Sequence, residues 1–206
     1  MPRDDIAWIE TIDPQEASGR LEQLYRRLRG PEGAVDNIMA VHSLRPHGME
    51  GHLALYKAVL HHARNQLPRA FLEAIGVQVS LLNGCAYCVE HHWAGLRRLL
   101  DDDARADEIR AALEADAPER AFAGRELAAL RYARALTVEP ASLDRSLLVA
   151  MREAGLDDGE ILEVNQVTAY FAYANRTVLG LGVTTEGDVL GLSPSATDDP
   201  DDWSHR

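Results

Sequence analysis

The chain has 206 residues, 33 acidic and 21 basic side chains, and a formal net charge of -12. Hydrophobic residues make up 46% of it, which is enough to bury the core of an ordinary domain and excludes a chain that is disordered throughout. The acidic balance argues against binding to duplex nucleic acid and to anionic membrane surfaces, because both reward Lys and Arg.

The chain contains two cysteines, Cys85 and Cys88, which excludes a secreted scaffold stapled by several disulfides. Residues 1–5 lack the apolar region of a signal peptide. No apolar run approaches the roughly 20 residues that a bilayer span needs. We therefore expect a soluble, cytoplasmic protein.

Helical signals follow one another along the chain. Asp13-Pro14-Gln15-Glu16 predicts a helix that starts at an acidic N-cap and runs to about residue 28. Periodic apolar residues then predict helices over 36–42, 46–64, 68–82 and 85–100.

The second half continues in the same way. Further helices are predicted over 104–115, 125–136, 142–154 with Ser142 as N-cap, and 157–179, where Asp157 and Glu160 form a capping box. No stretch alternates with a period of two, so we expect no strands. The sequence therefore predicts an all-α fold, a compact helical bundle.

The last residues differ from the rest. Residues 184–206 carry six acidic side chains against the single Arg206, and they lack apolar periodicity. We divide the chain into a helical domain over 1–183 and an acidic, poorly packed tail over 184–206, laid on the surface or on a partner subunit.

The sharpest motif is Cys85-x2-Cys88-x3-His92, which follows the helix-ending pair Asn83-Gly84. On a helix, Cys85, Cys88 and His92 fall within roughly 60° of one another, so both sulfurs and the imidazole project to one side. His91 lies at the edge of that side. The geometry therefore prefers His92 as the functional imidazole.

The position of the motif favours thiol chemistry. Free backbone N–H groups and the positive end of the helix dipole stabilise a thiolate in the first turn. Cys85 and Cys88 are spaced so that a disulfide can form and open without moving the helix. His92 can relay a proton, and Glu73 on the preceding predicted helix can orient its imidazole.

Other readings of the motif remain open. Two buried cysteines can be inert small hydrophobic residues. A zinc site would combine Cys85, Cys88 and His92 with a fourth ligand, but structural zinc sites usually have a second ligand pair, and His61-His62 is the only other cluster. Attachment of c-type haem is excluded, because Val89 rather than a His follows Cys88.

The pattern Glu73-x11-Cys85-x2-Cys88-x3-His92 resembles the signature of the alkylhydroperoxidase D-like group in the carboxymuconolactone decarboxylase superfamily. The wording of residues 82–88 is most similar to its peroxidase-related branch. The resemblance extends over about 6–183. It implies an all-helical fold that assembles as a homo-oligomer, a trimer or a hexamer.

The resemblance also implies roles for the motif residues. Cys88 would attack a peroxide, Cys85 would resolve the sulfenic acid as a disulfide, and Glu73 with His92 would relay protons. No cofactor and no metal would be needed, and electrons would come from an external dihydrolipoyl- or thioredoxin-type thiol. Tyr87 departs from the pattern, because the best-studied members have a His between the cysteines.

The function that we expect is therefore a thiol-dependent peroxidase acting on a small peroxide. One alternative is a non-catalytic helical oligomer that acts as a redox sensor or binds zinc. Another is an enzyme of the lactone decarboxylase type, against which the intact cysteine pair counts. Asn175-Arg176, on the last predicted helix, is expected to be a buried polar clamp between helices or subunits.

Overall fold

The computed structural model describes residues 6–29, 33, 35–199 and 202. Every regular element assigned in these residues is a helix. The one β-type contact among them is an isolated bridge between His62 and Thr197. The all-α fold predicted from the sequence is confirmed. In the described part of the chain, no helix is both long and apolar enough to cross a membrane.

The helices of the described residues are joined by short connections. The first five are α1 (Gly19–Leu28), α2 (Asn37–Ala40), α3 (Pro46–Leu60), α4 (Arg69–Leu82) and α5 (Ala86–Leu100). The next four are α6 (Asp103–Glu114), α7 (Gly124–Val138), α8 (Arg145–Glu153) and α9 (Asp158–Leu181). Two single 3-10 turns, η1 (Pro118–Arg120) and η2 (Pro140–Ser142), flank α7.

Three predicted helix ends are wrong. Asp13 caps a tight turn instead of a helix, since its carboxylate accepts the N–H of Gln15, and α1 begins only at Gly19. Ser142 lies in η2, and the N-cap of α8 is Asp144, whose carboxylate accepts the N–H of Ser146. Helix α3 ends at Leu60 rather than near residue 64.

The predicted start of the longest helix is confirmed. The Asp157 carboxylate accepts the backbone N–H of Glu160, and the Glu160 carboxylate accepts that of Asp157, which completes the capping box of α9. The end of α4 also follows the prediction, since Gly84 has φ +69°, a left-handed conformation that Gly adopts readily.

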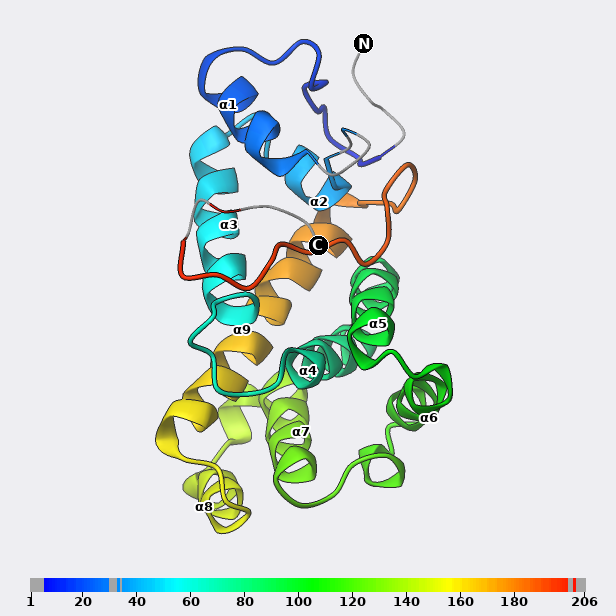
Figure 1. Ribbon diagram of the computed structural model, residues 1–206, viewed down its shortest axis with the longest axis vertical. Coiled ribbons are helices and arrows are strands. Elements are labelled where there is room, and N and C mark those ends of the chain that lie inside the picture. Colours follow the sequence, from blue (N-terminus) through cyan, green and yellow to red (C-terminus); the bar gives the residue numbers. More distant parts are fainter. Residues whose placement is uncertain (1–5, 30–32, 34, 200–201, 203–206) are drawn as a thin grey trace.

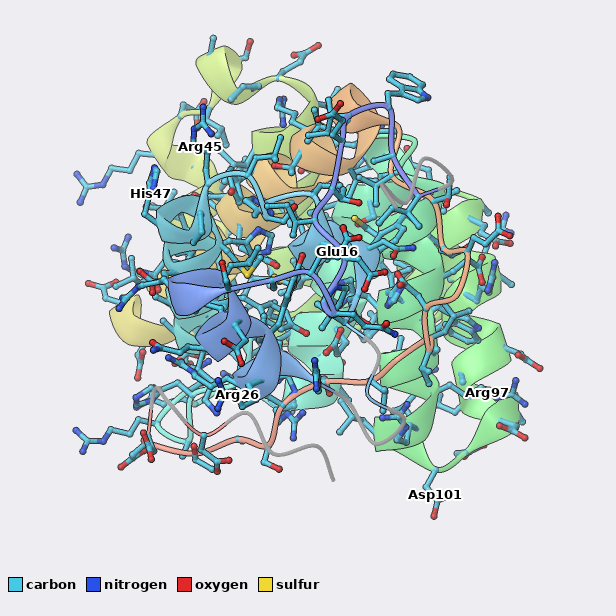
Figure 2. All side chains as sticks on the ribbon, turned by 90° about the horizontal axis from the view of Figure 1, so that it is seen from above. Glu16, Arg26, Arg45, His47, Arg97 and Asp101 are labelled. Atoms are coloured by element: carbon cyan, nitrogen blue, oxygen red, sulfur yellow. The ribbon has the colours of Figure 1, made fainter. Side chains whose placement is uncertain are left out.

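Helix α4 forms the centre of the molecule. Every residue from Phe71 to Ser80 is buried, and α4 packs against α5, α9 and α7 (Figure 1). Charged side chains such as Arg97 and Asp101 lie at the outer edge of the molecule in the view of Figure 2. A helix buried on all sides is apolar all round, so the polar residues that it does carry need partners inside the core.

The C-terminal segment, residues 184–199, differs from its prediction. It was expected to be poorly packed, yet it runs across α5 and α3 (Figure 1). Gly191 sits against the backbone of Ala94 in α5, and the buried Lys57 of α3 donates to the carbonyl of Ser195. The segment is held mainly through hydrogen bonds to its backbone. Such bonds do not require a periodic pattern of apolar side chains in the sequence. Residues 203–206 lie outside the described residues.

The close approach of α4 to α9 predicts a strong effect of one substitution. A Cβ on Gly76 would lie 2.2 Å from Phe171 Cζ, and Phe171 is fully buried. We expect Gly76→Ala to lower the free energy of unfolding in urea by about 1–3 kcal/mol through overpacking.

Gly51→Ala on α3 is the matched control. A Cβ there meets nothing within 4 Å, and the residue is exposed. It should raise the free energy of unfolding by about 0.5–1 kcal/mol, the usual gain of Ala over Gly in a helix. An equal gain from Gly76→Ala would contradict the close packing of α4 on α9.

Candidate active site

The two cysteines lie at the junction between α4 and α5. Cys85 is the N-cap of α5, and its backbone N–H donates to the carbonyl of Ser80 at 2.9 Å. Cys88 follows in the first turn. Both are free thiols, and their exposed fractions are 0% and 2%. Because α4 ends just before Gly84 and α5 starts directly after Cys85, both sulfurs are buried at the N-terminus of a helix.

Glu73 and His92 lie in direct contact. The Nδ1–H of His92, on α5, donates to Glu73 Oε2, on α4, at 2.6 Å. Glu73 is 3% exposed and the His92 side chain 14%. Because the carboxylate holds the proton on Nδ1, the other ring nitrogen, Nε2, is the one left to accept a proton. The His92 ring also packs edge-on to Phe171 at 4.5 Å.

The two thiols have opposite electrostatic environments. The pKa of Cys85 is lowered, chiefly by the hydrogen bond from the Cys88 thiol, with help from the Cys88 backbone N–H and Asn175. The same bond between the thiols, together with burial, raises the pKa of Cys88 well above its ordinary value. When one of the two thiols ionises, the negative charge therefore falls on Cys85 and the proton stays on Cys88.

Of the predicted polar clamp Asn175-Arg176, only Asn175 is buried, and Arg176 is exposed. Asn175 is fully buried on α9, its Nδ2 donates to Ser80 Oγ at 3.1 Å, and its Oδ1 accepts from Asn83 Nδ2 at 2.8 Å. These bonds tie α9 to the last turn of α4, directly before the cysteine motif. Asn175 therefore fixes the turn that leads into Cys85.

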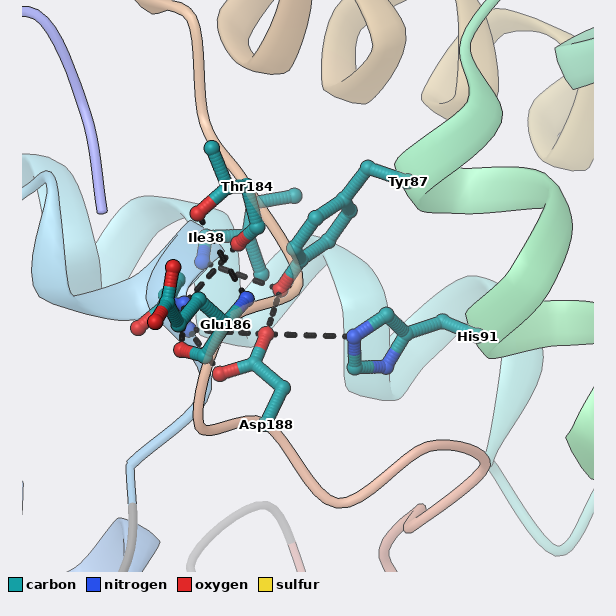
Figure 3. Close-up of polar contacts among 7 residues, drawn as sticks. Ile38, Tyr87, His91, Thr184, Glu186 and Asp188 are labelled. Carbon is teal, nitrogen blue, oxygen red and sulfur yellow. Dashed lines mark hydrogen bonds and ion pairs between the residues drawn. The ribbon is translucent and has the colours of Figure 1, made fainter. Parts of the chain in front are cut away.

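A second network joins the motif to the C-terminal segment (Figure 3). Asp188 Oδ2 accepts from the Tyr87 hydroxyl at 2.6 Å and from His91 Nε2 at 3.1 Å. Its other oxygen accepts the backbone N–H of Asn37 at 3.0 Å. The Asp188 side chain is 1% exposed. Tyr87 thus serves as a donor to this carboxylate, and burial with the nearby acids raises its pKa well above the ordinary value.

A small cavity lies over Cys88. Its volume is about 40 Å³, room for about three water molecules. Cys88, His92 and Glu73 line it from α5 and α4, whereas Cys85 does not reach it. The remaining walls come from Asp36, from aromatic residues of α3 and α9, and from the C-terminal segment; among them are Tyr56, Tyr170, Leu192 and Ser193.

Asp36 is the unexpected member of this cavity. Burial, and secondarily the negative charge of Asp188, raise the pKa of its carboxyl to about 6, while His91 and His92 act in the opposite direction. No hydrogen bond reaches its side chain from any residue of the described ranges. Its carboxyl is thus able to gain or lose a proton close to neutral pH.

Metal ligands do not gather at the site. Within the residues that the structure describes, no group of three or more His, Cys, Asp and Glu side chains is arranged to hold a metal ion. His61 and His52 are buried apart, the first against Tyr56 and the second bonded to the Tyr170 hydroxyl at 3.0 Å. The described residues therefore offer no set of donors that would support the zinc-binding alternative.

A family model assigns the central part of the chain. Residues 46–135, which include Glu73, both cysteines and His92, match the model of the carboxymuconolactone decarboxylase family. This match supports the resemblance to the carboxymuconolactone decarboxylase superfamily and its alkylhydroperoxidase D-like group that the cysteine motif indicates. No curated protein sequence matches the chain significantly.

Several solved structures share the fold. A peroxidase-related protein of Ralstonia eutropha JMP134, an alkylhydroperoxidase AhpD core, aligns with TM-score 0.76 and 23% identity over 87% of this chain and 92% of its own. A peroxidase-related protein of Silicibacter sp. TM1040 aligns with TM-score 0.73 and 21% identity over 89% and 93%. The debrominase Bmp8 aligns with TM-score 0.67 and 20% identity over 87% and 91%.

The sequence alone does not point to two acidic residues of the site, Asp36 and Asp188. Both lie within segments that have no motif, far along the chain from the cysteines. The signal that existed was Tyr87, since a phenol between the cysteines needs an acceptor when it is buried. That requirement points to an acceptor without saying which residue supplies it.

The network of Asp188 predicts how firmly the C-terminal segment is held. Asp188→Ala leaves the Tyr87 hydroxyl and the Asn37 N–H buried without this acceptor, which costs about 1–3 kcal/mol. We expect amide hydrogen exchange over 184–199 to become faster. Asp198→Ala is the control, since its exposed pair with Arg64 contributes little. Equal exchange in the two variants would contradict the anchoring role of Asp188.

The raised pKa of Asp36 predicts a dependence of stability on pH. The folded protein binds this proton up to about pH 6 and the unfolded chain only to about 3.8, so the carboxyl's contribution is full below 3.8 and lost as pH rises through 6. Asp36→Asn has no such loss. Its free energy of unfolding should exceed that of the wild type by about 2 kcal/mol at pH 8, allowing for partial screening by solvent.

The difference should shrink as the pH is lowered from 6 towards 4, measured by urea unfolding at each pH. Asp107→Asn, on the exposed face of α6, removes the same charge without the cavity and should show no such trend. A constant difference across this range would show that Asp36 titrates normally.

Proposed function

We propose that the protein is a thiol-dependent peroxidase that reduces a small hydroperoxide through a Cys85/Cys88 dithiol–disulfide cycle. The observation that carries the proposal is the position of Cys88. It opens on the cavity beside the Glu73–His92 pair, and the Cys85 thiol, three residues before it, is near enough to raise its pKa. Nucleophile, base, orienting carboxylate and resolving thiol are thus next to one another.

The first step is the attack on the peroxide. The Cys88 proton leaves to His92 Nε2 through cavity water, while Glu73 stabilises the imidazolium that forms. The Cys88 sulfur attacks the distal peroxide oxygen and the O–O bond breaks. The products are a Cys88 sulfenic acid and an alkoxide, which takes up a proton to become the alcohol.

The second step is resolution. The Cys85 thiolate attacks the Cys88 sulfenic acid, the S–S bond forms, and hydroxide leaves as water after it takes up a proton. The net reaction converts two thiols and one hydroperoxide into a disulfide, an alcohol and water. The lowered pKa of Cys85 suits this role, because a resolving cysteine must be a thiolate when the sulfenic acid appears.

The cycle closes with an outside reductant. An external dithiol of the dihydrolipoyl or thioredoxin type would reopen the Cys85–Cys88 disulfide, and the proposed steps need neither metal nor flavin. We expect the protein to act as a homo-oligomer, a trimer or a hexamer, in the cytoplasm. Light scattering of the purified protein would test the oligomer.

The cavity beside Cys88 has room for the two oxygens of a hydroperoxide. A variant of the debrominase Bmp8 has been solved with 2,3,4-tribromopyrrole, so a protein of the same fold also binds a brominated ring. A lactone decarboxylase is not favoured, because the cysteine pair would have no part in that reaction.

Serine variants of the cysteines test the cycle. Treatment of the wild type with one equivalent of hydroperoxide should remove two thiols per chain and two hydrogens of mass. Cys88→Ser should abolish peroxide consumption. Cys85→Ser should allow one turnover and leave a Cys88 sulfenic acid that dimedone captures, read by mass spectrometry.

Two outcomes would contradict this assignment. Full peroxide turnover by Cys88→Ser would show that Cys88 is not the attacking thiol. Stoichiometric zinc in the purified protein, together with thiols that ignore peroxide, would favour the non-catalytic zinc-binding or sensor alternative.

A further inference from the structure

We propose that Asp36 is a catalytic acid, which gives its proton to the oxygen that departs when Cys88 cleaves the peroxide bond. The inference rests on the proposed peroxidase function and adds a residue that the cysteine motif does not contain. Asp36 comes from the start of α2, where its backbone carbonyl accepts the N–H groups of Met39 and Ala40.

The chemistry requires such a donor. When the Cys88 sulfur bonds to the distal oxygen, both electrons of the O–O bond pass to the other oxygen. That atom departs as an alkoxide, a strong base and a poor leaving group, unless a proton arrives as the bond breaks. Transfer of the Asp36 proton yields the alcohol and an Asp36 carboxylate, which solvent then reprotonates.

The arrangement of the cavity makes Asp36 the available donor. Three carboxyl groups lie in or beside it. Glu73 is bonded to His92, and Asp188 accepts from Tyr87, His91 and Asn37. The side chain of Asp36 lines the cavity with Cys88 and makes no hydrogen bond to the described residues. Its oxygens are therefore free to contact a bound peroxide.

The groups facing Asp36 set its protonation. Helix α5 presents His91 and His92, and the C-terminal segment presents Asp188. Tyr56 of α3 and Tyr87 of α5 also line the cavity, and both have a pKa raised well above the ordinary value, so they remain neutral. Burial outweighs the two imidazoles and brings the pKa of Asp36 to about 6.

This value suits the role. With a pKa of about 6, roughly a tenth of the molecules carry the Asp36 proton at pH 7. An acid whose pKa lies near the working pH combines adequate protonation with a strong tendency to donate. His92 would take the proton of the thiol and Asp36 would supply that of the alcohol, which assigns base and acid to different residues of the cavity.

Two oxidants with different leaving groups test the proposal. tert-Butyl hydroperoxide releases an alkoxide that needs a proton, whereas peracetic acid releases a carboxylate that does not. We expect Asp36→Asn to slow the single-turnover reaction with tert-butyl hydroperoxide by about 100-fold and the reaction with peracetic acid by less than about 3-fold. Stopped-flow measurement of thiol loss gives both rates.

Iodoacetamide supplies a third reaction with the same thiol. Its iodide leaves without a proton, so Asp36→Asn should alkylate at the wild-type rate. Asp36→Glu, which keeps a carboxylic acid, should recover part of the lost rate with tert-butyl hydroperoxide. Asp107→Asn, an exposed change of the same charge on α6, should match the wild type in all three reactions.

The dependence on pH adds a readout that a structural role would not move. The ratio of the rate with tert-butyl hydroperoxide to the rate with peracetic acid does not depend on the ionisation of Cys88, because both reactions share that step. In the wild type this ratio should fall as pH rises from 5 to 7, because Asp36 loses its proton near pH 6. In Asp36→Asn it should be constant.

The possible failures are distinct. An equal loss with both oxidants and iodoacetamide would overturn the acid role, since Asp36 would then act on the thiol itself. An unchanged rate with tert-butyl hydroperoxide in Asp36→Asn would also overturn it, while leaving the peroxidase function in place. A wild-type protein that reacts with neither oxidant would overturn the proposed function and this inference together.

Discussion

The site depends on a carboxylate buried inside the central helix. Glu73 lies in a stretch of α4 whose residues are all buried, and a lone ionised carboxyl there would cost several kcal/mol. His92 Nδ1–H offsets this cost through the 2.6 Å bond. Because His92 belongs to α5, the bond also fixes how α5 lies against α4, and the cysteines one and two turns before His92 are positioned with it. The pairing that stabilises the charge therefore aligns the nucleophile with its base.

The parts of this arrangement that the sequence predicts are local. Cys85, Cys88 and His92 share one helix, so their common face follows from helical geometry alone. The end of α4 follows from Asn83-Gly84, and the capping box of α9 follows from Asp157 and Glu160. Local signals fail where several acceptable caps compete, as with Asp13 and Ser142. There the tertiary position of the helix decides which residue begins it.

What the sequence could not predict depends on long-range contacts. Asp188 meets Tyr87 and Asn37 across separations of 101 and 151 residues. Nothing within residues 184–199 indicates that their backbone is anchored by Lys57 and Arg69. An acidic stretch without apolar periodicity looks the same whether it is free in solvent or held by remote donors. Asp36 lacks a motif for the same reason. Its importance arises from the cavity that other elements build around it.

The buried carboxyls of the site differ in the hydrogen bonds that they receive. Glu73 and Asp188 are both buried, and each has donors that stabilise its charge. Asp36 has none from the described residues, and burial raises the pKa of its carboxyl to about 6. The two thiols also differ, since the pKa of Cys85 is lowered and that of Cys88 is raised. Because Asp188 belongs to the C-terminal segment and its charge raises the pKa of Asp36, displacement of that segment would lower this pKa. The position of the segment is thereby coupled to the acid that we propose for the reaction.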